Sequence, residues 1–495
     1  MNNASTSTIT IDVLIVGAGP VGLFLANECA RRGLRWRIVE QRPRQSEHSK
    51  ALAVMPRTLE IFDMAGIVAP FLEKANRVTS VAVVTHGHHL GQIPFAPPDT
   101  PYPFVAMVPQ DVTEALLVQA LRSRGGAVEY ETSFVSAAQD DDGVDVVLEH
   151  RGERSSVRAA FVVGCDGAHS AVRHALALPF EGAQYDATFM LADIATNDAL
   201  PGDELHLCPH EDGPLAIFPM SRTRRRVVAS IRNGHGEGDA PSLDLVRSVL
   251  AQRAPHGLEA RALNWSSYFR IQHRQVAAMQ VGRIFVAGDA AHIHSPFGGQ
   301  GMNTGLQDAW NLAWKLDLAV HRRARPELLE SYTAEREPVV RRVIETTHFM
   351  TQALGTPSRF AQALRDAVIP IVARLAPFRY RFVRRLSELG VDYHGSAMVE
   401  GPGQRYFDDS LRGGSGIGSR FVLLVDADDR SRTAAEARRL ATDFGNVVEL
   451  RVGAHHGITL VRPDGYTAYE SLQGTPSAAL QSIREVLERQ VVSSS

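Results

Sequence analysis

The residues best suited to chemistry lie in one glycine-rich stretch, GDAAHIHSPFGGQGMN, at positions 288–303. The apolar run 283–287 predicts a buried strand that ends at Gly288 and Asp289, and a helix is predicted to begin at about Asn303. A carboxylate at a strand end can accept hydrogen bonds from ribose hydroxyls. The start of a helix offers unpaired backbone N–H groups and the positive end of the helix dipole. This arrangement indicates a dinucleotide site at Asp289.

The glycines of the same stretch suit a flat ring. Gly298, Gly299 and Gly301 carry no side chain, so the backbone can approach a ring system closely, and Pro296 stiffens the approach. The loop is therefore predicted to hold a flavin.

A second nucleotide motif lies near the N-terminus. Residues 9–16 are typical of a core strand, which breaks at a G-x-G-x-x-G sequence that opens a helix ending near Gly33. Gly17 allows a tight turn, Gly19 lets backbone N–H groups reach a pyrophosphate, and Gly22 permits close packing of the helix on the sheet.

The next predicted strand completes this motif. It spans residues 35–40 and ends in Glu40, 23 positions after Gly17 (40 − 17), where a ribose-binding acid is expected. The motif alone would also suit NAD. A second nucleotide-contacting strand end at Asp289, about 270 residues later, favours FAD instead.

Three motifs together resemble a known family. They are VGAGPVG, CDGAHSAVR at positions 165–173 and GDAAHIHSPFGGQGMNTGLQDAWNLAWKL. The chain is similar to the single-component FAD-dependent aromatic hydroxylases, the class of para-hydroxybenzoate hydroxylase and phenol hydroxylase. It most resembles the branch of polyketide hydroxylases that carry a C-terminal thioredoxin-like domain. The similarity of pattern extends from about residue 9 to residue 470.

The resemblance implies a set of FAD-binding residues in the glycine-rich turn, at strand ends and in the loop before the 303 helix. They are Gly17, Gly19, Pro20, Gly22, Glu40, Lys50, Gln110, Val135, Asp166, Asp289, Pro296, Gly299, Gly301, Met302 and Asn303. Glu40 would hold the adenosine ribose and Asp289 the ribityl or pyrophosphate region. The backbone N–H groups of residues 301–303 would face the pyrimidine end of the flavin and stabilise the anionic reduced ring.

Four of these assignments depend on single matches. Lys50 stands where the family usually has arginine, and it keeps the charge but lacks the planar fork. Gln110 matches a glutamine that touches the flavin, and Val135 matches a backbone contact to adenine. Asp166 would serve both flavin and nicotinamide nucleotide, although a plain turn capped by Asp166 or Ser170 is the alternative.

The fold class expected is α/β, with a Rossmann-like FAD-binding domain, an inserted antiparallel β-sheet domain for the substrate, and a thioredoxin-like domain. The predicted ranges are 1–75, 105–180 and 270–395 for the FAD-binding domain, 76–104 and 181–269 for the substrate domain, and 396–495 for a linker and the C-terminal domain. The linker is expected at residues 401–418. No cysteine follows Cys208, so the last domain has no redox cysteines.

The substrate sheet offers few distinctive residues. Phe218, Pro219 and Met220 are predicted to line the substrate pocket, although an apolar strand is more often simply core. The basic cluster Arg222, Arg224, Arg225 and Arg226 indicates a solvated hairpin turn, with attraction of an anionic substrate or NADPH phosphate as the alternative.

Composition is consistent with a large enzyme without nucleic-acid or membrane partners. The chain has 495 residues and a net charge of −3, and it contains no run of about 18 apolar residues that could span a membrane. The polar first ten residues lack the features of a signal peptide, so a cytoplasmic location is expected. His206, Cys208 and His210 could share one strand face, but an intervening proline and the lack of a fourth ligand argue against a metal.

The resemblance implies an NAD(P)H-consuming monooxygenase that uses FAD, dioxygen and a flavin hydroperoxide to hydroxylate a phenolic or polycyclic polyketide-like substrate. A Baeyer–Villiger or epoxidising enzyme on the same fold is one alternative, and a non-catalytic flavin-binding interaction protein is another. No residue of the sequence can be named as the catalytic base. A homodimer is possible.

Overall fold

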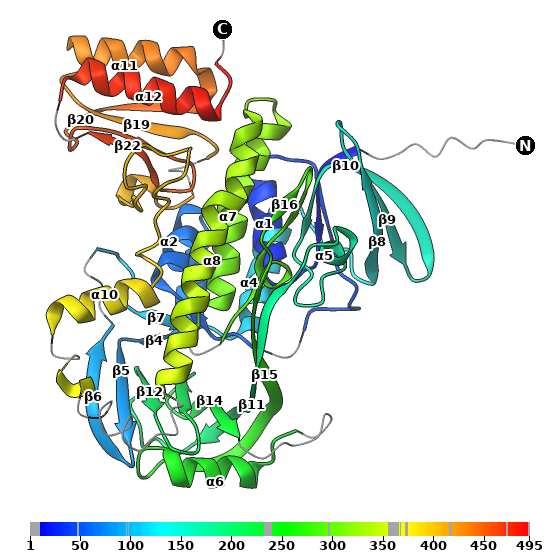
Figure 1. Ribbon diagram of the computed structural model, residues 1–495, viewed down its shortest axis with the longest axis vertical. Helices are drawn as coiled ribbons and strands as arrows, with labels where there is room; N and C mark the ends of the chain where they lie inside the picture. The colour runs from blue at the N-terminus through cyan, green and yellow to red at the C-terminus, as the bar shows by residue number, and fades with distance from the viewer. Residues whose placement is uncertain are drawn as a thin grey trace, which may run out of the picture.

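The computed structural model describes residues 10–46, 49–95, 97, 99–231, 240–295, 298–354, 366, 368–371, 375–414, 418–471 and 474–493. It is a mixed α/β molecule in which two long helices, α7 (Gly301–Val320) and α8 (Pro326–Leu354), stand in the middle (Figure 1). An eight-stranded sheet lies at one end of this pair, and a four-stranded sheet with two helices lies at the other. None of the helices described is both long and apolar enough to cross a membrane.

The central sheet contains four neighbouring parallel strands in the order β17-β10-β1-β2. They are β17 (Ile284–Val286), β10 (Glu153–Gly164), β1 (Thr10–Val16) and β2 (Trp36–Val39). Their interiors are rich in fully buried Val, Ile and Leu, as expected of parallel strands covered on both faces. Parallel strands end at a common edge of the sheet, so the segments that follow these four strands converge there.

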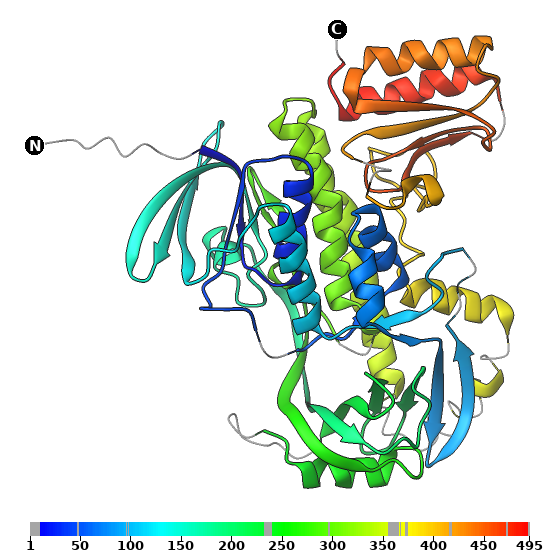
Figure 2. The same cartoon turned by 180° about the vertical axis from the view of Figure 1, so that it is seen from behind.

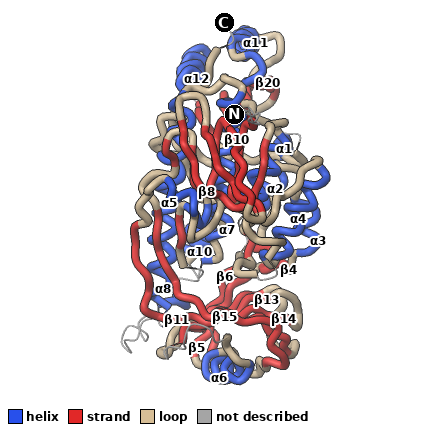
Figure 3. The backbone as a smooth tube through the Cα atoms, turned by 90° about the vertical axis from the view of Figure 1, so that its right-hand side faces the viewer, coloured by secondary structure: helices blue, strands red, loops and turns tan. Residues whose placement is uncertain are grey.

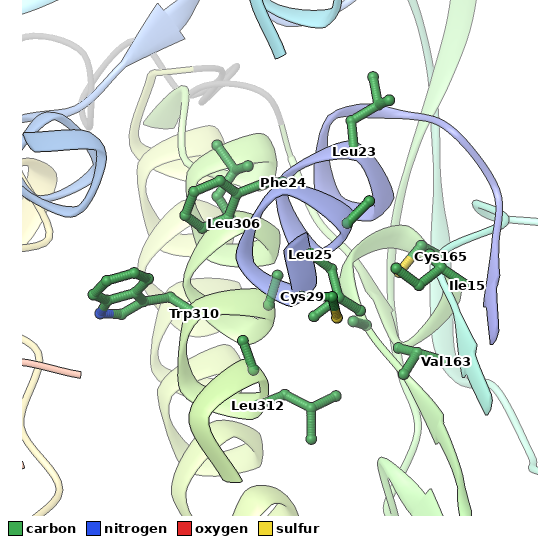
Figure 4. Close-up of a cluster of buried hydrophobic side chains, with 14 of the residues drawn as sticks. Ile15, Leu23, Phe24, Leu25, Cys29, Val163, Cys165, Leu306, Trp310 and Leu312 are labelled. Atoms are coloured by element: carbon green, nitrogen blue, oxygen red, sulfur yellow. The ribbon is translucent and has the colours of Figure 1, made fainter. Parts of the chain in front are cut away.

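Helix α1 (Pro20–Arg31) follows β1 and packs between the central sheet and α7. Proline at its first position needs no hydrogen-bond partner for its nitrogen, which favours a helix start. Phe24 of α1 stacks on Trp310 of α7 with ring centroids 6.1 Å apart, and Leu23, Leu25 and Cys29 lie in the same cluster as the sheet residues Ile15 and Val163 (Figure 4). The two helices are thereby locked side by side on one face of the sheet.

Smaller elements complete the central body. A hairpin of β8 (Thr132–Gln139) and β9 (Val144–His150) extends the sheet from β10 and projects from its side (Figure 2). Strand β16 (Gln280–Val281) pairs with β17, and β3 (Ala53–Val54), β7 (Val105–Met107) and β4 (Asn76–Val78) form a short separate sheet. The helices are α2 (Pro56–Met64), α3 (Val68–Lys74), α4 (Gln110–Ser123) and α5 (Ala171–Ala175).

The eight-stranded sheet draws its strands from separate parts of the chain. In spatial order they are β18 (His292–Ile293), β15 (Ala260–Gln275), β11 (Glu181–Thr196), β14 (Arg224–Ile231), β13 (Leu215–Pro219), β12 (Glu204–Cys208), β5 (Ser80–Thr85) and β6 (His88–Pro94). Helix α6 (Leu243–Arg253) covers its outer face, and the central sheet lies on its other side (Figure 3). Its inner face therefore turns toward the middle of the molecule.

The C-terminal unit is a four-stranded sheet in the order β20-β19-β21-β22, with two helices on its outer face (Figure 1). Its elements are β19 (Phe421–Asp426), α11 (Arg432–Asp443), β20 (Val448–Gly453), β21 (Ile458–Val461), β22 (Thr467–Ser471) and α12 (Pro476–Gln490). The sequence pattern predicts strands at 420–426, 446–452 and 458–462 and helices at 432–444 and 477–490, so β22 is the strand without a predicted counterpart. Ser431 and Thr475 cap the two helices by accepting from Ala434 N and Ala478 N.

The segment predicted as a linker is packed against the body. Leu411 is buried, and Tyr406 N donates to Gly465 O at 2.8 Å. The guanidinium of Arg405 pairs with Glu60 of α2 at 2.6 Å, and Gly414 N donates to Asp63 O. Glycines at residues 401–414 thus serve close packing and turns rather than a loose tether. A helix that the sequence did not single out, α10 (Ala376–Leu386), precedes this segment.

A fully buried set of charges joins α7 and α8 to the C-terminal unit. The carboxylate of Glu335 on α8 accepts from both terminal nitrogens of Arg462 at 2.6 and 2.8 Å and from Lys315 Nζ at 2.8 Å. Asn311 and Ser396 also donate to it. Burial alone would raise the pKa of Glu335, but Arg462 and Lys315 hold it below its usual value. All three ions have hydrogen-bond partners, as burial of charge requires.

Replacing Glu335 by alanine leaves Arg462 and Lys315 buried without their shared anion. We expect the free energy of unfolding to fall by roughly 3–5 kcal/mol. Urea unfolding followed by tryptophan fluorescence measures the loss, with Arg432→Ala as the control. Arg432 is 89% exposed, so removing its ion pair with Glu436 should leave the free energy of unfolding almost unchanged. Equal effects of the two substitutions would contradict a structural role for the buried set.

Candidate functional site

The glycine-rich turn after β1 shows different constraints at its three motif glycines. A Cβ on Gly17, whose φ is +102°, would lie 2.4 Å from Cys165 O, and one on Gly22 would lie 2.0 Å from Gly17 O. A Cβ on Gly19 would meet nothing within 4 Å. Gly17 and Gly22 are therefore needed by the fold itself, whereas Gly19 faces open space in front of the first turn of α1.

Glu40 follows β2 and faces this turn. Its carboxylate accepts from Ala18 N at 2.8 Å and from the backbone and side chain of Arg42 at 3.0 and 2.9 Å. Burial would raise the pKa of Glu40, but these hydrogen bonds outweigh it and lower the pKa. The predicted acid is therefore held ionised at the end of the strand where a ribose is expected.

Asp166 follows β10 at the same edge of the sheet. Its Oδ2 accepts from Val172 N at 3.2 Å, and its Oδ1 is buried without a hydrogen-bond partner among the described residues. Ser170 caps helix α5 by accepting from Arg173 N at 2.9 Å. Arg173 is buried and donates to Ala290 O at 3.0 Å, so it lies on no solvated helix face. The turn has one unsatisfied acceptor to offer a ligand.

Asp289 follows β17 at the same edge of the sheet. Its side chain is open to solvent, yet enough protein surrounds it that desolvation raises its pKa above the ordinary value. His292 and Lys50 act in the opposite direction, which places the exposed Lys50 within electrostatic reach of Asp289. An accessible carboxylate in poorly hydrated surroundings, faced by a cation, is typical of a ligand-binding cleft.

The loop beyond Asp289 is fixed from behind by Asp308 of α7. Its Oδ2 accepts from Gly288 N at 3.1 Å and contacts His292 Nε2 at 2.7 Å. Its Oδ1 accepts from Arg336 Nε at 2.8 Å. Burial would raise the pKa of Asp308, and His292 and Arg336 together lower it. His292 therefore buttresses the loop.

Helix α7 begins at Gly301 in front of this loop. Its first internal hydrogen bond runs from Thr304 N to Gln300 O, so the N–H groups of residues 301–303 precede the ladder. The Asn303 side chain donates to Ala53 O and Gly299 O and accepts from Met55 N at 2.9 Å. Asn303 thus fixes the helix start against β3. Pro296 lies outside the described residues.

Gln110 is the first residue of α4, and Val135 lies in β8. Gln110 Oε1 accepts from Ala51 N at 3.1 Å, and its Nε2 donates to Glu114 at 3.0 Å, so the side chain braces the segment that carries Lys50. Val135 occupies the irregularity of β8 between Phe134 and Ser136 and has no paired residue on β9. Its backbone is thereby left out of the ladder.

The three predicted pocket residues do not share one face. Phe218 and Met220 pack with Ala53 and Met55 beside the start of α7. Pro219 is the next residue along the strand, so its side chain points to the other face, and its backbone carbonyl oxygen accepts from Asn76 at 3.0 Å. Whether these residues line a substrate pocket stays a prediction.

The basic cluster is not the solvated turn that the sequence indicated. Arg222 and Arg224 are exposed, but Arg225 and Arg226 are fully buried. Arg226 pairs with Asp193 through bonds of 2.7 and 2.8 Å and donates to Lys50 O and Ala51 O at 3.0 and 3.1 Å. Four arginines within five positions suggested a segment exposed to solvent. The apolar run 227–231 that follows them was the available signal that this strand starts inside the protein.

Histidines gather in two places on the eight-stranded sheet. Among the described residues, two groups bring three potential ligand atoms within 4.8 Å of one another, namely His86, His210 and Glu211, and His89, Glu204 and His206. Cys208 belongs to neither group. His206 Nε2 already lies 3.1 Å from Glu204 Oε1, a hydrogen-bonding distance. The absence of a bound metal stays a prediction.

Comparison with known proteins agrees with this geometry. The family described as "FAD binding domain" matches residues 10–347. The 6-methylpretetramide 4-monooxygenase of Streptomyces rimosus is 32% identical over 95% of this chain and 93% of its own. The anhydrotetracycline hydroxylase OxyS of Streptomyces rimosus superposes with a TM-score of 0.79 at 28% identity, covering 97% and 99% of the two chains. CabE, an aromatic hydroxylase from angucycline biosynthesis, gives 0.77 at 30% identity, covering 95% and 98%.

The chain belongs to this FAD-binding family. It is an FAD-dependent monooxygenase of the aromatic hydroxylase class, and NAD(P)H is the reductant general to that class. The resemblance drawn from the three sequence motifs is thereby confirmed.

One buried acid of this monooxygenase was not found from the sequence. Glu388 lies beneath the first turn of α7, where it accepts from Thr304 Oγ1 at 3.2 Å and from the side-chain amide of Gln307. Its backbone has a φ of +60°, and burial raises its pKa to about 8. Nothing in its local sequence, RRLSELG, distinguishes it from a surface glutamate.

The raised pKa of Glu388 makes stability depend on pH. Between about 4.5 and 8 the folded protein keeps this proton and the unfolded chain has lost it. The contribution is full below the unfolded pKa and is lost as pH rises toward 8, with a slope of about 1.4 kcal/mol per pH unit. Urea unfolding from pH 5 to 9 should show Glu388→Gln to be less pH-dependent than wild type. Parallel curves would contradict the protonated carboxyl.

Gly19 allows folding and ligand binding to be separated. Gly19 has φ −74°, and its Cβ position is open, so Gly19→Ala should leave the stability of the apoprotein unchanged. The added methyl group would occupy the space that a pyrophosphate needs, so FAD affinity should fall by at least about tenfold. Fluorescence titration of apoprotein with FAD measures this. Gly418→Ala, at an equally open position, is the matched control. Unchanged affinity in Gly19→Ala would place the pyrophosphate elsewhere.

Proposed function

We propose that this monooxygenase hydroxylates a phenolic polycyclic aromatic compound bound between the eight-stranded sheet and the start of α7. The observation that carries this is an aromatic face on the inner side of that sheet, formed by Phe189, Phe218, Trp265 and Phe269. Phe189 and Phe269 have ring centroids 5.8 Å apart. Flat aromatic rings stack on such side chains with their faces or edges.

The position of this aromatic face follows from strand register. Phe218 lies directly opposite Arg226, and Trp265 lies opposite Asp193, so all four share one side of the sheet. Arg226 on that side reaches the carbonyl oxygens of Lys50 and Ala51, the segment that faces Asp289. A ring on the aromatic face would therefore lie next to the proposed flavin site.

The relatives support a substrate of several rings. Their names refer to 6-methylpretetramide, anhydrotetracycline and angucycline biosynthesis, and each matches nearly the whole chain. Pentachlorophenol 4-monooxygenase of Sphingobium chlorophenolicum, whose name gives a single ring, is 31% identical but matches only 71% of the chain. We infer a polycyclic rather than a monocyclic phenol.

FAD would lie across the carboxyl ends of the four parallel strands. We assign the pyrophosphate to Gly17, Gly19, Pro20 and Gly22, and to the helix N-terminus that follows them. The open space at Gly19, the unpartnered Oδ1 of Asp166 and the poorly hydrated Asp289 fit a bound dinucleotide. The further contacts proposed are Glu40, Lys50, Gln110, Val135, Pro296, Gly299, Gly301, Met302 and Asn303.

When bound, FAD supplies the electron transfer from NADPH or NADH and the activation of dioxygen. The N–H groups at the start of α7 stabilise negative charge on the ring without a cationic side chain. The apolar face of the sheet excludes water and orients the ring to be hydroxylated. Asn303 and Asp308 hold the helix and loop, so these donors do not have to reorganise.

The remaining assignments follow the same proposal. We assign residues 1–75, 105–180 and 270–395 to a discontinuous Rossmann-like FAD-binding domain, 76–104 and 181–269 to the substrate domain, and 396–495 to a thioredoxin-like domain. The three cysteines, all buried and all outside the last range, support a non-redox role for the C-terminal domain.

The need for NADPH or NADH supports a cytoplasmic location. Exposed Phe349 and Ile371, 70% and 61% exposed, support a homodimer, which light scattering tests.

Turnover under isotopically labelled dioxygen tests the proposed activity. FAD-loaded enzyme with NADPH should add one labelled oxygen atom to the ring of 1-naphthol or 1-hydroxyanthraquinone, and should act on phenol at least about tenfold more slowly in kcat/KM. Product mass and fragmentation measure this. Oxygen inserted into a carbon–carbon bond, or hydrogen peroxide as the sole product, would contradict hydroxylation.

A paired variant tests the aromatic face. Trp265→Ala should lower kcat/KM for the polycyclic compound by about tenfold, because a stacking surface is lost. Val492→Ala, a change at an exposed residue of the C-terminal unit, is the control and should leave kcat/KM unchanged. An equal loss toward phenol would indicate a general disturbance rather than lost stacking.

A further inference from the structure

His294 stands between the two halves of the proposed site. It directly follows β18, which pairs with β15 at the edge of the eight-stranded sheet, and it precedes the start of α7 by a few residues. The chain therefore passes from the substrate sheet to the flavin helix at this side chain.

The hydrogen bonding of His294 fixes which of its ring nitrogens carries a proton. Nδ1 lies 3.0 Å from the carbonyl oxygen of Ser295. A carbonyl oxygen can only accept, so Nδ1 is the donor and Nε2 of the neutral ring holds a free lone pair. Nε2 is buried and has no hydrogen-bond partner among the described residues. Leaving a buried acceptor unpaired is costly, which points to a partner supplied by a ligand.

The surroundings keep this ring neutral. Burial, together with the nearby His292, lowers the pKa of His294 to about 4. The imidazole is therefore an uncharged acceptor throughout the physiological range of pH. It cannot pair with an anion, and it requires an N–H or O–H group as its partner.

Space for such a partner exists at the helix start. The position of a Cβ on Gly301 would lie 3.6 Å from Nε2 of His294, and Gly301 has no side chain to fill it. The unpaired N–H groups at this helix start, those of residues 301–303, are donors. His294 is thus an acceptor beside a row of donors, at the junction of the cofactor and substrate regions.

We propose that Nε2 of His294 accepts a hydrogen bond from the ring hydroxyl of the aromatic substrate. This inference rests on the function proposed above. The bond orients the hydroxyl-bearing ring and draws electron density from the O–H bond toward the ring, which makes the ring carbons more nucleophilic. Complete proton transfer is not required, and the low basicity of the imidazole opposes it. His294 is then a catalytic residue that touches the substrate.

A cycle of binding measurements tests the inference without turnover. The FAD-loaded enzyme is titrated with 1-naphthol and with naphthalene, and binding is followed by the change in flavin absorbance. His294→Leu removes the acceptor, whereas His294→Gln keeps an acceptor oxygen at a similar reach. Wild type and His294→Gln should bind 1-naphthol about tenfold more tightly than naphthalene, equivalent to about 1.4 kcal/mol. In His294→Leu the two affinities should be about equal.

The remaining outcomes are also decisive. A preference for 1-naphthol that survives in His294→Leu would overturn the inference and leave the proposed function intact. Loss of FAD affinity in His294→Leu, with the naphthol preference kept, would assign Nε2 to an N–H group of the flavin. Failure of both compounds to bind the wild-type holoenzyme would contradict the aromatic face itself, because a site for a polycyclic ring must accept naphthalene.

Nuclear magnetic resonance supplies an independent signature. In protein labelled with 15N-histidine, Nε2 of His294 should give the shift of an unprotonated nitrogen from pH 6 to 8, and 1-naphthol should move it toward the hydrogen-bonded value. Naphthalene should not. A protonated Nε2 in the free enzyme would contradict the assigned tautomer. The melting temperature of His294→Leu, compared with wild type, shows whether the variant is folded.

Discussion

The carboxylate of Asp308 holds together the parts on which the site depends. It binds the backbone of Gly288 at the end of β17, the imidazole of His292 at the edge of the eight-stranded sheet, and the guanidinium of Arg336 on α8. These groups come from three different layers of the molecule. A buried charge that is shared among several donors has one favourable arrangement, so it fixes the loop in one shape. The position of Asp289 and the unpaired N–H groups at the start of α7 both depend on that fixed shape.

A second buried charge set attaches the C-terminal unit to the same two helices. Arg462 and Asp464 lie in the turn between β21 and β22, and they meet Glu335 and Asn311 on α8 and α7. Trp310 Nε1 also donates to Asp464 O at 2.9 Å. Helix α7 is therefore held near its middle by contacts from a separate sheet. Whatever else the C-terminal unit does, its contacts stiffen the support of α7.

The sequence was informative where the chemistry is local. The strand, glycine turn, helix and acid from Thr10 to Glu40 were predictable because each glycine and the acid have short-range physical roles. The strand before Asp289 and the helix after Gly301 were also predicted within a few residues. The C-terminal order of strands and helices followed from hydrophobic periodicity, with β22 alone missed.

The sequence was uninformative where a residue's role depends on a distant partner. Arg226 resembles a surface arginine until Asp193, 33 positions earlier, is brought opposite it by the pairing of β11 and β14. Glu388 resembles a solvated glutamate until α7 is placed over it. The alternation of Pro219 away from Phe218 and Met220 required the strand register, which no local pattern supplies. His294 needed the carbonyl oxygen of Ser295 to settle its tautomer.

The scattered origin of the central sheet has a consequence for synthesis of the protein. Strand β1 lies between β10 and β2, and β10 in turn needs β17, so the edge that carries the nucleotide motif is incomplete until about residue 290 has been made. At roughly 5–20 residues per second, the ribosome needs about 15–55 s to go from Gly17 to Asp289. During that time first β1 lacks its neighbour β10, and then β10 lacks its neighbour β17. The nascent chain should therefore depend on chaperones before it can capture its cofactor.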